Sequence, residues 1–519
     1  MTRDGNAEYE TPPPQPTPGA LKIERNGIEP IPDGERTSRP FDLFRLAFGG
    51  ANTLSSCIIG ALTIMLGLSF WQAIAVAVVG LVVGGLLLSP VGLVGSATGT
   101  NNAVSSSADL GVHGRIVGSV IALVTAVVIF AIAVWASGDA IVGTFERLTG
   151  TAAPDWTYGV AYSFFACVTI VVCVYGYQFM LLINKVSVIA VTLMFVVGAF
   201  AFAPMFESGY AGVFTEVADP QTRILLWPTM ITCLLIVMSN PIGYGAFLGD
   251  WSRYLPRTTP RHRTLAAVFF SQLATIIPFT FGIMIASIIA RKTPELAFGD
   301  QASLVVGMLQ LAPTWFFIPL AAIAILGGIA TGTTALYGTG LDFSSMFAKL
   351  NRAASTALIG ALSLAVIFIG RFVFDMVSTL TAWVTLIITI TVPWMVILVI
   401  GYVVRRGWYD PESLTVFIRH QRGGRYWFAR GWNLRGVAAW VVSAIIAVLF
   451  INLPGTFVGP LGNVAAGIDL SLPVAIVSSG IAYLALLRLF PLPNYVFPAD
   501  GPLGVPSRDQ PQPPIEPGH

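Results

Sequence analysis

Long apolar stretches alternate with short polar segments along most of the chain, from residue 44 to residue 490. Most of these stretches hold about 18 residues or more, which lets an α-helix cross a hydrocarbon core about 30 Å thick. Uninterrupted apolar runs also argue against a membrane barrel, whose strands alternate over about ten residues. The pattern therefore predicts an all-α polytopic membrane protein, with spans at residues 44–67, 70–95, 114–146, 157–183, 185–206, 224–248, 265–290, 313–337, 354–370, 373–404, 434–453 and 471–490.

Composition agrees with this pattern. Of the 519 residues, 55% are hydrophobic and 10% are charged, whereas soluble domains carry about 25% charged residues. The four cysteines lie inside predicted spans, where a thiol behaves as a small apolar group, so no structural disulfide is expected.

The distribution of Lys and Arg predicts the orientation. If the N-terminus is cytoplasmic, the inner loops hold fifteen basic residues and the outer loops five. Cytoplasmic loops carry the excess of positive charge in membrane proteins. No short apolar signal segment precedes the first span. We therefore expect a multi-pass protein of a bacterial-type inner (plasma) membrane with both termini in the cytoplasm.

The segments outside the spans divide the chain further. Residues 1–43 and 491–519 are rich in Pro and polar groups, so they are expected to be disordered cytoplasmic tails. A ten-helix core at 44–404 is followed by a basic cytoplasmic loop at 405–433 and two additional helices at 434–490. The basic loop lies between two spans, so its charge is interpreted as juxtamembrane charge and no nucleic-acid partner is expected.

Helix-weakening residues interrupt two spans near mid-membrane, at residues 49–52 in the first and 239–245 in the sixth. If 44–206 and 224–404 are two repeats of five helices, each repeat opens with a broken helix, as in inverted-repeat transporters. Broken helices free backbone groups that need a partner, so they line a cavity that holds a substrate or ion. The alternative is that Gly and Pro only allow kinks or close packing.

No catalytic constellation accompanies this architecture. The four histidines lie in loops or a tail without metal-ligand spacing, and no nucleophile motif or nucleotide-binding loop occurs. The protein is therefore not expected to be an enzyme or to carry a cofactor. Uphill transport would take its energy from a cation gradient, as in a secondary transporter.

Flat, neutral heterocycles need aromatic faces for stacking and amides for hydrogen bonds to their edges. Residues of both kinds lie near the breaks and in the third and eighth spans. Any one of them can instead serve only helix packing. The candidate substrate-binding residues are Asn52, Asn102, Phe130, Trp135, Asn240, Tyr244, Phe247 and Tyr337.

Charged residues within spans are functional candidates. Asp139 in the third span is the candidate for proton coupling, with a polar residue at the outer end of a long helix as the alternative. Asp250 and Arg253 follow the sixth span near the cytoplasmic surface, where gating or a structural ion pair is expected.

Several motifs point to a family. The residues Gly249-Asp-Trp-Ser-Arg-Tyr-Leu-Pro256 are the most specific of them. This chain resembles the nucleobase:cation symporter-1 family, particularly its purine-cytosine permease branch. The other matching segments are Gly27-Ile-Glu-Pro-Ile-Pro32, Leu66-Gly-Leu-Ser-Phe-Trp-Gln72, Leu336-Tyr-Gly-Thr-Gly-Leu-Asp342 and Arg405-Arg-Gly-Trp-Tyr-Asp410.

The resemblance implies a LeuT-like core of five plus five inverted repeats with two added helices, working by alternating access. It also implies cation symport of cytosine, purines, hydantoins, allantoin or similar compounds. By the same match, Tyr244 stands where the branch usually has Trp, and Asn102 where many relatives have Gln. Val128 and Ile129 replace a Gly-Trp pair, and Ala335 lies near an Asn of relatives.

The resemblance bears on the coupling ion as well. Sodium-using relatives place Ser or Thr hydroxyls on the eighth span. Here Gly327-Gly-Ile-Ala330 occupies that region, with Thr331, Thr333 and Thr334 following as candidate coupling residues. We therefore favour protons over sodium.

Two rival functions remain open on the sequence. One is a carrier of amino acids or other small solutes on the same fold, which would hold a carboxylate at the half-helix N-termini. The other is a membrane receptor that does not transport. A small-molecule ligand and the lipid bilayer are the expected partners.

Overall fold

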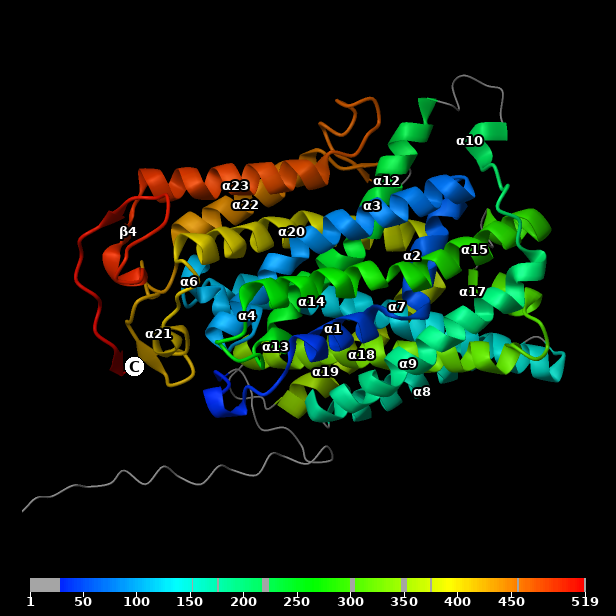
Figure 1. Ribbon diagram of the computed structural model, residues 1–519, viewed down its shortest axis with the longest axis horizontal. Coiled ribbons are helices and arrows are strands. Elements are labelled where there is room, and N and C mark those ends of the chain that lie inside the picture. The colour runs from blue at the N-terminus through cyan, green and yellow to red at the C-terminus, as the bar shows by residue number, and fades with distance from the viewer. Residues whose placement is uncertain are drawn as a thin grey trace, which may run out of the picture.

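The computed structural model describes residues 29–151, 153–174, 177–216, 224–298, 304–346, 352–373, 376–454 and 457–517. Within these residues, seven helices are long and apolar enough to cross a membrane. One bent pair of helices and four shorter apolar helices coincide with the remaining predicted spans. The helices lie side by side along one axis of the molecule (Figure 1). The all-α membrane fold is confirmed, and the helices match the twelve predicted spans.

The helices that match these spans have the following bounds: α1 (Pro40–Ala51) with α2 (Leu54–Met65), α3 (Phe70–Leu88), α7 (Arg115–Thr149), α8 (Asp155–Val174), α9 (Tyr177–Phe202), α12 (Leu226–Gly243), α14 (Arg261–Ala274) with α15 (Ile276–Lys292), α18 (Phe317–Met346), α19 (Arg352–Val373), α20 (Met376–Val404), α22 (Leu434–Leu449) and α23 (Ser471–Leu489).

Shorter elements connect the spans. They are η1 (Asp33–Glu35), η2 (Ser89–Val91), α4 (Gly92–Thr98), α5 (Asn102–Ser105), α6 (Ser107–Leu110), η3 (Ala203–Met205), α10 (Val213–Glu216), η4 (Tyr244–Ala246), α13 (Leu248–Ser252), α16 (Pro294–Ala297), α17 (Leu304–Leu311), α21 (Pro411–Leu414) and η5 (Asn494–Val496). In the part of the chain that the structure describes, six two-residue strands form three pairs, β1 (Gln421–Arg422) with β6 (Glu516–Pro517), β2 (Asn452–Leu453) with β3 (Phe457–Val458), and β4 (Leu492–Pro493) with β5 (Ser507–Arg508).

The first span is broken where the sequence predicts. Helix α1 ends at Ala51, α2 begins at Leu54, and the two axes differ by 59°. Thr53 caps the second helix, because its side chain accepts a hydrogen bond of 3.2 Å from the backbone N–H of Ser56. This cap lets a helix restart in mid-membrane without leaving all its first N–H groups unpaired.

The sixth span breaks slightly later than predicted. Helix α12 continues through Pro241 to Gly243 and gives way to the 3-10 turn η4, after which α13 begins. Pro241 lacks an N–H and cannot complete the helical ladder. The break itself falls at residues 244–247, at the C-terminal edge of the predicted 239–245 segment.

Packing between the repeats is reciprocal. Helix α2 of the first repeat packs on α15 of the second, and α12 of the second repeat packs on α3 of the first. Small residues make both approaches possible, because a Cβ added to Gly60 would lie 2.6 Å from the Phe279 carbonyl oxygen, and one added to Gly84 would lie 2.3 Å from Pro241 Cγ. Helices α7 and α18 pack on each other along the middle of the core. Two inverted repeats produce this arrangement, in which a helix of each repeat packs against a helix of the other.

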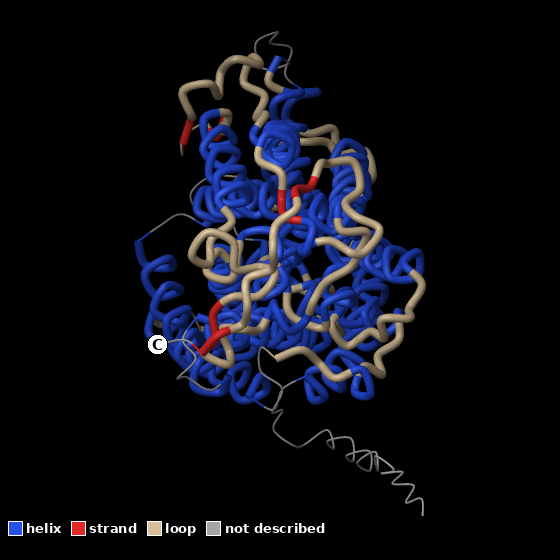
Figure 2. Tube along the Cα trace, turned by 90° about the vertical axis from the view of Figure 1, so that its left-hand side faces the viewer, coloured by secondary structure: helices blue, strands red, loops and turns tan. Residues whose placement is uncertain are grey.

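The loop at residues 405–433 and the chain's C-terminal segment form one cap over an end of the helix bundle (Figures 1 and 2). Strand β6 pairs with β1 of the loop, and the Leu503 N–H donates to the Val404 carbonyl at 2.9 Å. Residues 491–517, expected to be a disordered tail, thus have ordered backbone contacts. Composition could not reveal them, because the partner strands lie in a distant loop. Residues 1–28, which hold most of the N-terminal tail, lie outside the described residues.

Candidate functional site

A small cavity of about 60 Å³ lies where the two broken spans meet α7, α18 and α20. On a scale of roughly 15 Å³ for each water, it has room for about four waters. Seven elements and the break between α1 and α2 line it, with the residues Gly50, Thr53, Ser55, Ser56, Ile59, Val128, Ile129, Ile132, Ser239, Asn240, Gly243, Tyr244, Thr331 and Ile387.

Thr331 connects α18 to the break in the first span. Its hydroxyl lies 2.7 Å from the Gly50 carbonyl oxygen and 3.2 Å from the Gly327 carbonyl oxygen. A carbonyl at a helix end has no helical partner and needs a donor in an apolar environment. Thr331 therefore satisfies the broken helix from across the cavity.

The sixth-span break supplies one amide and one aromatic ring to the cavity. Asn240 Nδ2 is buried, and no described residue accepts a hydrogen bond from it. The Tyr244 ring is 4% exposed and lies 5.6 Å, centroid to centroid, from the Trp251 ring. A buried amide donor without an acceptor costs free energy, so this position favours a ligand that brings an acceptor. Tyr244 offers such a ligand a flat face.

The other predicted substrate residues do not line the cavity. Phe130 and Phe247 are fully buried, Trp135 is 8% exposed, and all three lie among core side chains. Phe130 packs beside Gly332, where an added Cβ would lie 3.1 Å from the Phe130 ring. The side chain of Tyr337 lies outside the described residues.

The two remaining asparagines hold helices together. Asn52 Nδ2 donates to Thr192 Oγ1 of α9 at 3.1 Å, and Asn102 Nδ2 donates to the Gly245 carbonyl at 2.8 Å. Asn102 therefore satisfies a carbonyl that the sixth-span break leaves free. The side-chain oxygens of both asparagines are buried without a donor among the described residues.

The candidate coupling residues are separated in space. Thr331 reaches the cavity, whereas the Thr333 hydroxyl donates to the Ile329 carbonyl of its own helix at 2.8 Å. The side chain of Thr334 lies outside the described residues. Asp139, on α7, accepts a 2.6 Å hydrogen bond from the Tyr162 hydroxyl of α8. Within the described residues, no group of three His, Cys, Asp or Glu is placed to hold a metal ion.

Asp250 and Arg253 are both fully buried in and after α13. No described group donates to either carboxylate oxygen of Asp250. Arg253 instead donates to the Tyr254 hydroxyl at 3.2 Å and lies over the Tyr254 ring. Burial raises the pKa of the Asp250 carboxyl to about 7, although the charge of Arg253 opposes the shift. The described residues contain no direct Asp250–Arg253 ion pair within 4.0 Å.

Comparison with known proteins identifies the family. Residues 30–475 match the family described as permeases for cytosine/purines, uracil, thiamine and allantoin. The putative purine-cytosine permease YxlA of Bacillus subtilis is 23% identical over 478 residues, which cover 90% of this chain and 96% of that protein. The chain belongs to this permease family.

Solved structures show the same fold. One of them is Mhp1, a nucleobase-cation-symport-1 family transporter, in a closed conformation with bromovinylhydantoin bound. It superposes on this chain with a TM-score of 0.69 and 16% sequence identity, and the match covers 92% of this chain and 98% of Mhp1. The inward-facing conformation of Mhp1 superposes with a TM-score of 0.67 and 17% identity, over 92% of this chain and 97% of Mhp1. A Na⁺-coupled sialic acid symporter superposes with a TM-score of 0.56 and 12% identity, over 88% of this chain and 91% of the symporter. The LeuT-like architecture predicted from the sequence is confirmed.

In this permease the sequence analysis missed several cavity residues. Thr53, Ser55 and Ser56 stand just after the first break, and Ile387 stands on α20. The hydroxyl-rich segment that follows Asn52 was a usable signal, because residues after a mid-membrane break begin a new helix and face the same cavity. Ile387 carries no such signal, since it is one apolar residue among many.

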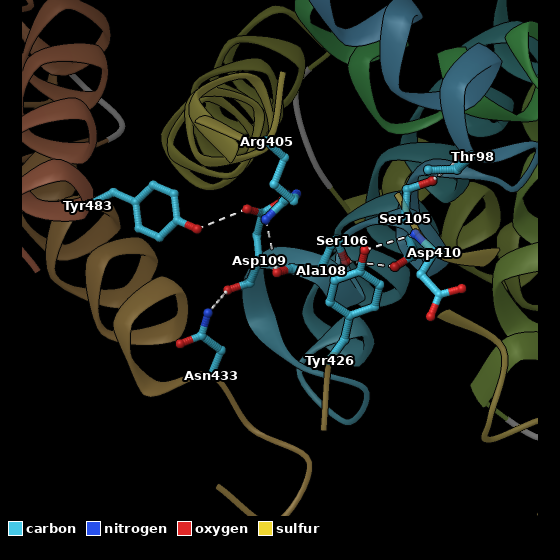
Figure 3. Close-up of polar contacts among 11 residues, drawn as sticks. Thr98, Ser105, Ser106, Ala108, Asp109, Arg405, Asp410, Tyr426, Asn433 and Tyr483 are labelled. Carbon is cyan, nitrogen blue, oxygen red and sulfur yellow. Dashed lines mark hydrogen bonds and ion pairs between the residues drawn. The ribbon is translucent and has the colours of Figure 1, made fainter. Parts of the chain in front are cut away.

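The permease also contains a buried polar cluster, called here the Asp109 cluster: Asp109, Arg405, Asn433 and Tyr483 (Figure 3). Asp109 Oδ2 lies 2.7 Å from Arg405 Nη2, and Oδ1 accepts a 2.8 Å hydrogen bond from the Tyr483 hydroxyl. Asn433 Nδ2 donates to the Asp109 carbonyl at 2.6 Å. The cluster therefore connects α6 and the end of α20 to α22 and α23. Each member lies in a different part of the sequence, so the sequence analysis did not find it.

Proposed function

We propose that this permease imports a nucleobase or related flat heterocycle, such as cytosine, a purine, a hydantoin or an allantoin-like compound, by proton symport with alternating access. Membership of the permease family supports transport of a small molecule across a membrane. The observation that carries the substrate class is the cavity between the two broken spans, where the Asn240 amide has no acceptor among the described residues and lies beside the Tyr244 ring.

The cavity offers the contacts that a flat heterocycle needs. The described residues of its lining include hydroxyls, one amide and one phenol, and none of them is charged. A carbonyl on a flat ring can accept from Asn240 while Tyr244 packs on its face. Val128 and Ile129 line the same cavity with aliphatic surfaces, at the position where the family resemblance implies a Gly-Trp pair. At about 60 Å³ the cavity must widen before such a ring enters, which agrees with a transporter that changes conformation during its cycle.

Two contacts favour protons as the coupling ion. The Gly50 carbonyl of the first break is already satisfied by the Thr331 hydroxyl, so it does not need a sodium ion. Asp139 is a half-buried carboxylate that accepts a hydrogen bond from Tyr162 and can take up a proton. Intramembrane carboxylates serve as proton relays in other transporters.

Uptake into liposomes tests this function. Purified full-length protein should accumulate at least one of labelled cytosine, adenine and allantoin when a proton gradient is applied, and labelled leucine should stay at background. A sodium gradient alone should give no accumulation. Uptake driven only by sodium would contradict the coupling ion, and leucine uptake would favour the amino-acid carrier. Saturable binding of a heterocycle without any flux would indicate a receptor.

A further inference from the structure

A second cavity, of about 600 Å³, lies at the cytoplasmic ends of α22 and α23. Residues of the C-terminal segment, including Tyr495 and Arg508, close its other side. In Figure 1 these two helices lie at the edge of the bundle, and their ends meet the segment that carries β4. This cavity is ten times larger than the cavity between the broken spans. The two cavities share no lining residue.

The charge of this cavity is uncompensated. Arg435 and Arg508 both line it, and no Asp or Glu does. Their positive charges repel each other. Among the described residues, neither guanidinium has a carboxylate within 4.0 Å. Burial raises the pKa of the Tyr495 phenol, and the charges of Arg508 and Arg435 oppose that shift. Among the described residues, two cations and no carboxylate line this space.

Three protein contacts hold the Arg435 guanidinium and leave some of its N–H donors unused. Its Nε donates to the Phe490 carbonyl, Nη2 donates to the Pro491 carbonyl at 3.3 Å, and Nη1 lies 3.4 Å from Asn433 Oδ1. A guanidinium has five N–H donors, so two remain for a ligand. No hydrogen bond or ion pair within the described residues involves the Arg508 side chain. The pair offers several donors to one anionic group.

The rest of the cavity is apolar and continues onto the outer surface of the helices. Leu434 is 65% exposed and Phe490 is 56% exposed, and both line the cavity. Farther along the same two helices, Ile445 is 57% exposed and Ile481 is 66% exposed. In a membrane protein, exposed apolar side chains on outer helices face lipid chains. An occupant of this cavity should therefore be amphipathic, with an anionic head and long apolar chains.

We propose that this cavity binds an anionic phospholipid of the cytoplasmic leaflet, with its phosphate between Arg435 and Arg508 and its acyl chains along α22 and α23. Basic pockets at the cytoplasmic ends of membrane helices hold anionic headgroups, and each basic residue near the surface contributes about 1 kcal/mol. Arg suits a phosphate because its planar fork donates two parallel hydrogen bonds. The lipid joins the C-terminal segment to the two added helices. The inference rests on the orientation predicted from the Lys and Arg distribution and does not depend on the transported substrate.

The test compares lipids on delipidated full-length protein in detergent. Thermal unfolding is followed while phosphatidylglycerol or phosphatidylcholine is added, and retained lipids are counted by native mass spectrometry. Phosphatidylglycerol should raise the melting temperature and be retained, whereas phosphatidylcholine should do neither at the same concentration. Arg508→Gln should need about fivefold more phosphatidylglycerol for the same effect, which is the change expected for about 1 kcal/mol.

Matched variants keep the result interpretable. Arg263→Gln removes one exposed positive charge from α14 and should respond to lipid like the wild type. Arg435→Lys keeps the positive charge but loses the planar guanidinium. The response of this variant to phosphatidylglycerol should therefore fall between those of the wild type and Arg508→Gln. The proposal is overturned if both lipids stabilise equally or if Arg508→Gln responds like the wild type. It is also overturned if inorganic phosphate alone reproduces the effect, since that would indicate a site for a free anion.

Discussion

The Arg405 guanidinium lies 2.7 Å from the Asp109 carboxylate, and each side chain is 1% exposed. The same carboxylate accepts a hydrogen bond from Tyr483, and Arg405 Nη1 also donates to the Ala108 carbonyl at 3.2 Å. Two charges removed from water this completely are stable only while each compensates the other. The fold of the permease therefore requires α6 and the end of α20 to stay in contact.

Arg405→Gln should destabilise the protein by about 3 to 5 kcal/mol, because it leaves the Asp109 carboxylate buried without its cation. Thermal unfolding in detergent, or the yield of monodisperse protein, measures the loss. The exposed pair Arg419 and Glu412 is the control, since the change Arg419→Gln should cost less than about 1 kcal/mol. Equal effects of the two substitutions would contradict the assignment.

Asp250→Asn should change how stability depends on pH. Burial raises the folded-state pKa from 3.8 to about 7, so the folded protein binds this proton more tightly than the unfolded chain. The stabilisation is fully present below about pH 4 and is lost as pH rises through 7. Thermal unfolding at pH 5 and pH 8 should show a larger fall for the wild type than for Asp250→Asn. Glu412→Gln, at an exposed position, should leave the wild-type difference intact.

Asn240→Ala should weaken substrate binding by about 1 to 3 kcal/mol, because the cavity loses its amide donor. Tyr244→Phe should retain most binding, whereas Tyr244→Leu should lose it, because stacking needs a flat ring. Competition binding and initial uptake rates measure both effects. Phe247→Leu is the matched aromatic control, since Phe247 does not line the cavity. A larger loss in Phe247→Leu than in Tyr244→Leu would place the substrate elsewhere.

Asp139→Asn should abolish accumulation driven by a proton gradient while leaving exchange of labelled for unlabelled substrate intact. The amide keeps the shape of the side chain but cannot take up and release a proton. Tyr162→Phe should have a smaller effect, because it removes only the hydrogen bond to the carboxylate. If Asp139→Asn still accumulates substrate like the wild type, the proton is carried by another group.

The sequence predicted the fold better than the site, and the reason is physical. Spans are local apolar runs, so all twelve could be placed, and the break at Gly49–Asn52 was visible as a weak stretch inside one of them. Which face of a helix looks into a cavity depends on its neighbours. Phe130 and Ile129 are adjacent in sequence, yet only Ile129 lines the cavity. Among the predicted residues, Asn240, Tyr244 and Thr331 line it, and each lies at a break or faces one.

Contacts between distant segments were beyond the sequence. Asp109 belongs to a short segment between two spans, where a charged residue is unremarkable, and Arg405 was one of many basic residues at the cytoplasmic side. Only the three-dimensional arrangement shows that they meet. The same holds for strands β1 and β6, whose pairing joins residues 421–422 to 516–517.

The Asp109 cluster also limits how the molecule can be divided into moving parts. Separating α6 from the end of α20 would leave the buried Asp109 and Arg405 charges unpaired. Separating α22 or α23 from α6 would break a buried hydrogen bond to Asp109. A conformational change that keeps these contacts must therefore move the C-terminal end of α20, the segment before α7 and the helix pair α22–α23 as one block. Helices α22 and α23, which are additional to the two repeats, are thereby fixed both to α6 of the first repeat and to the end of α20 of the second.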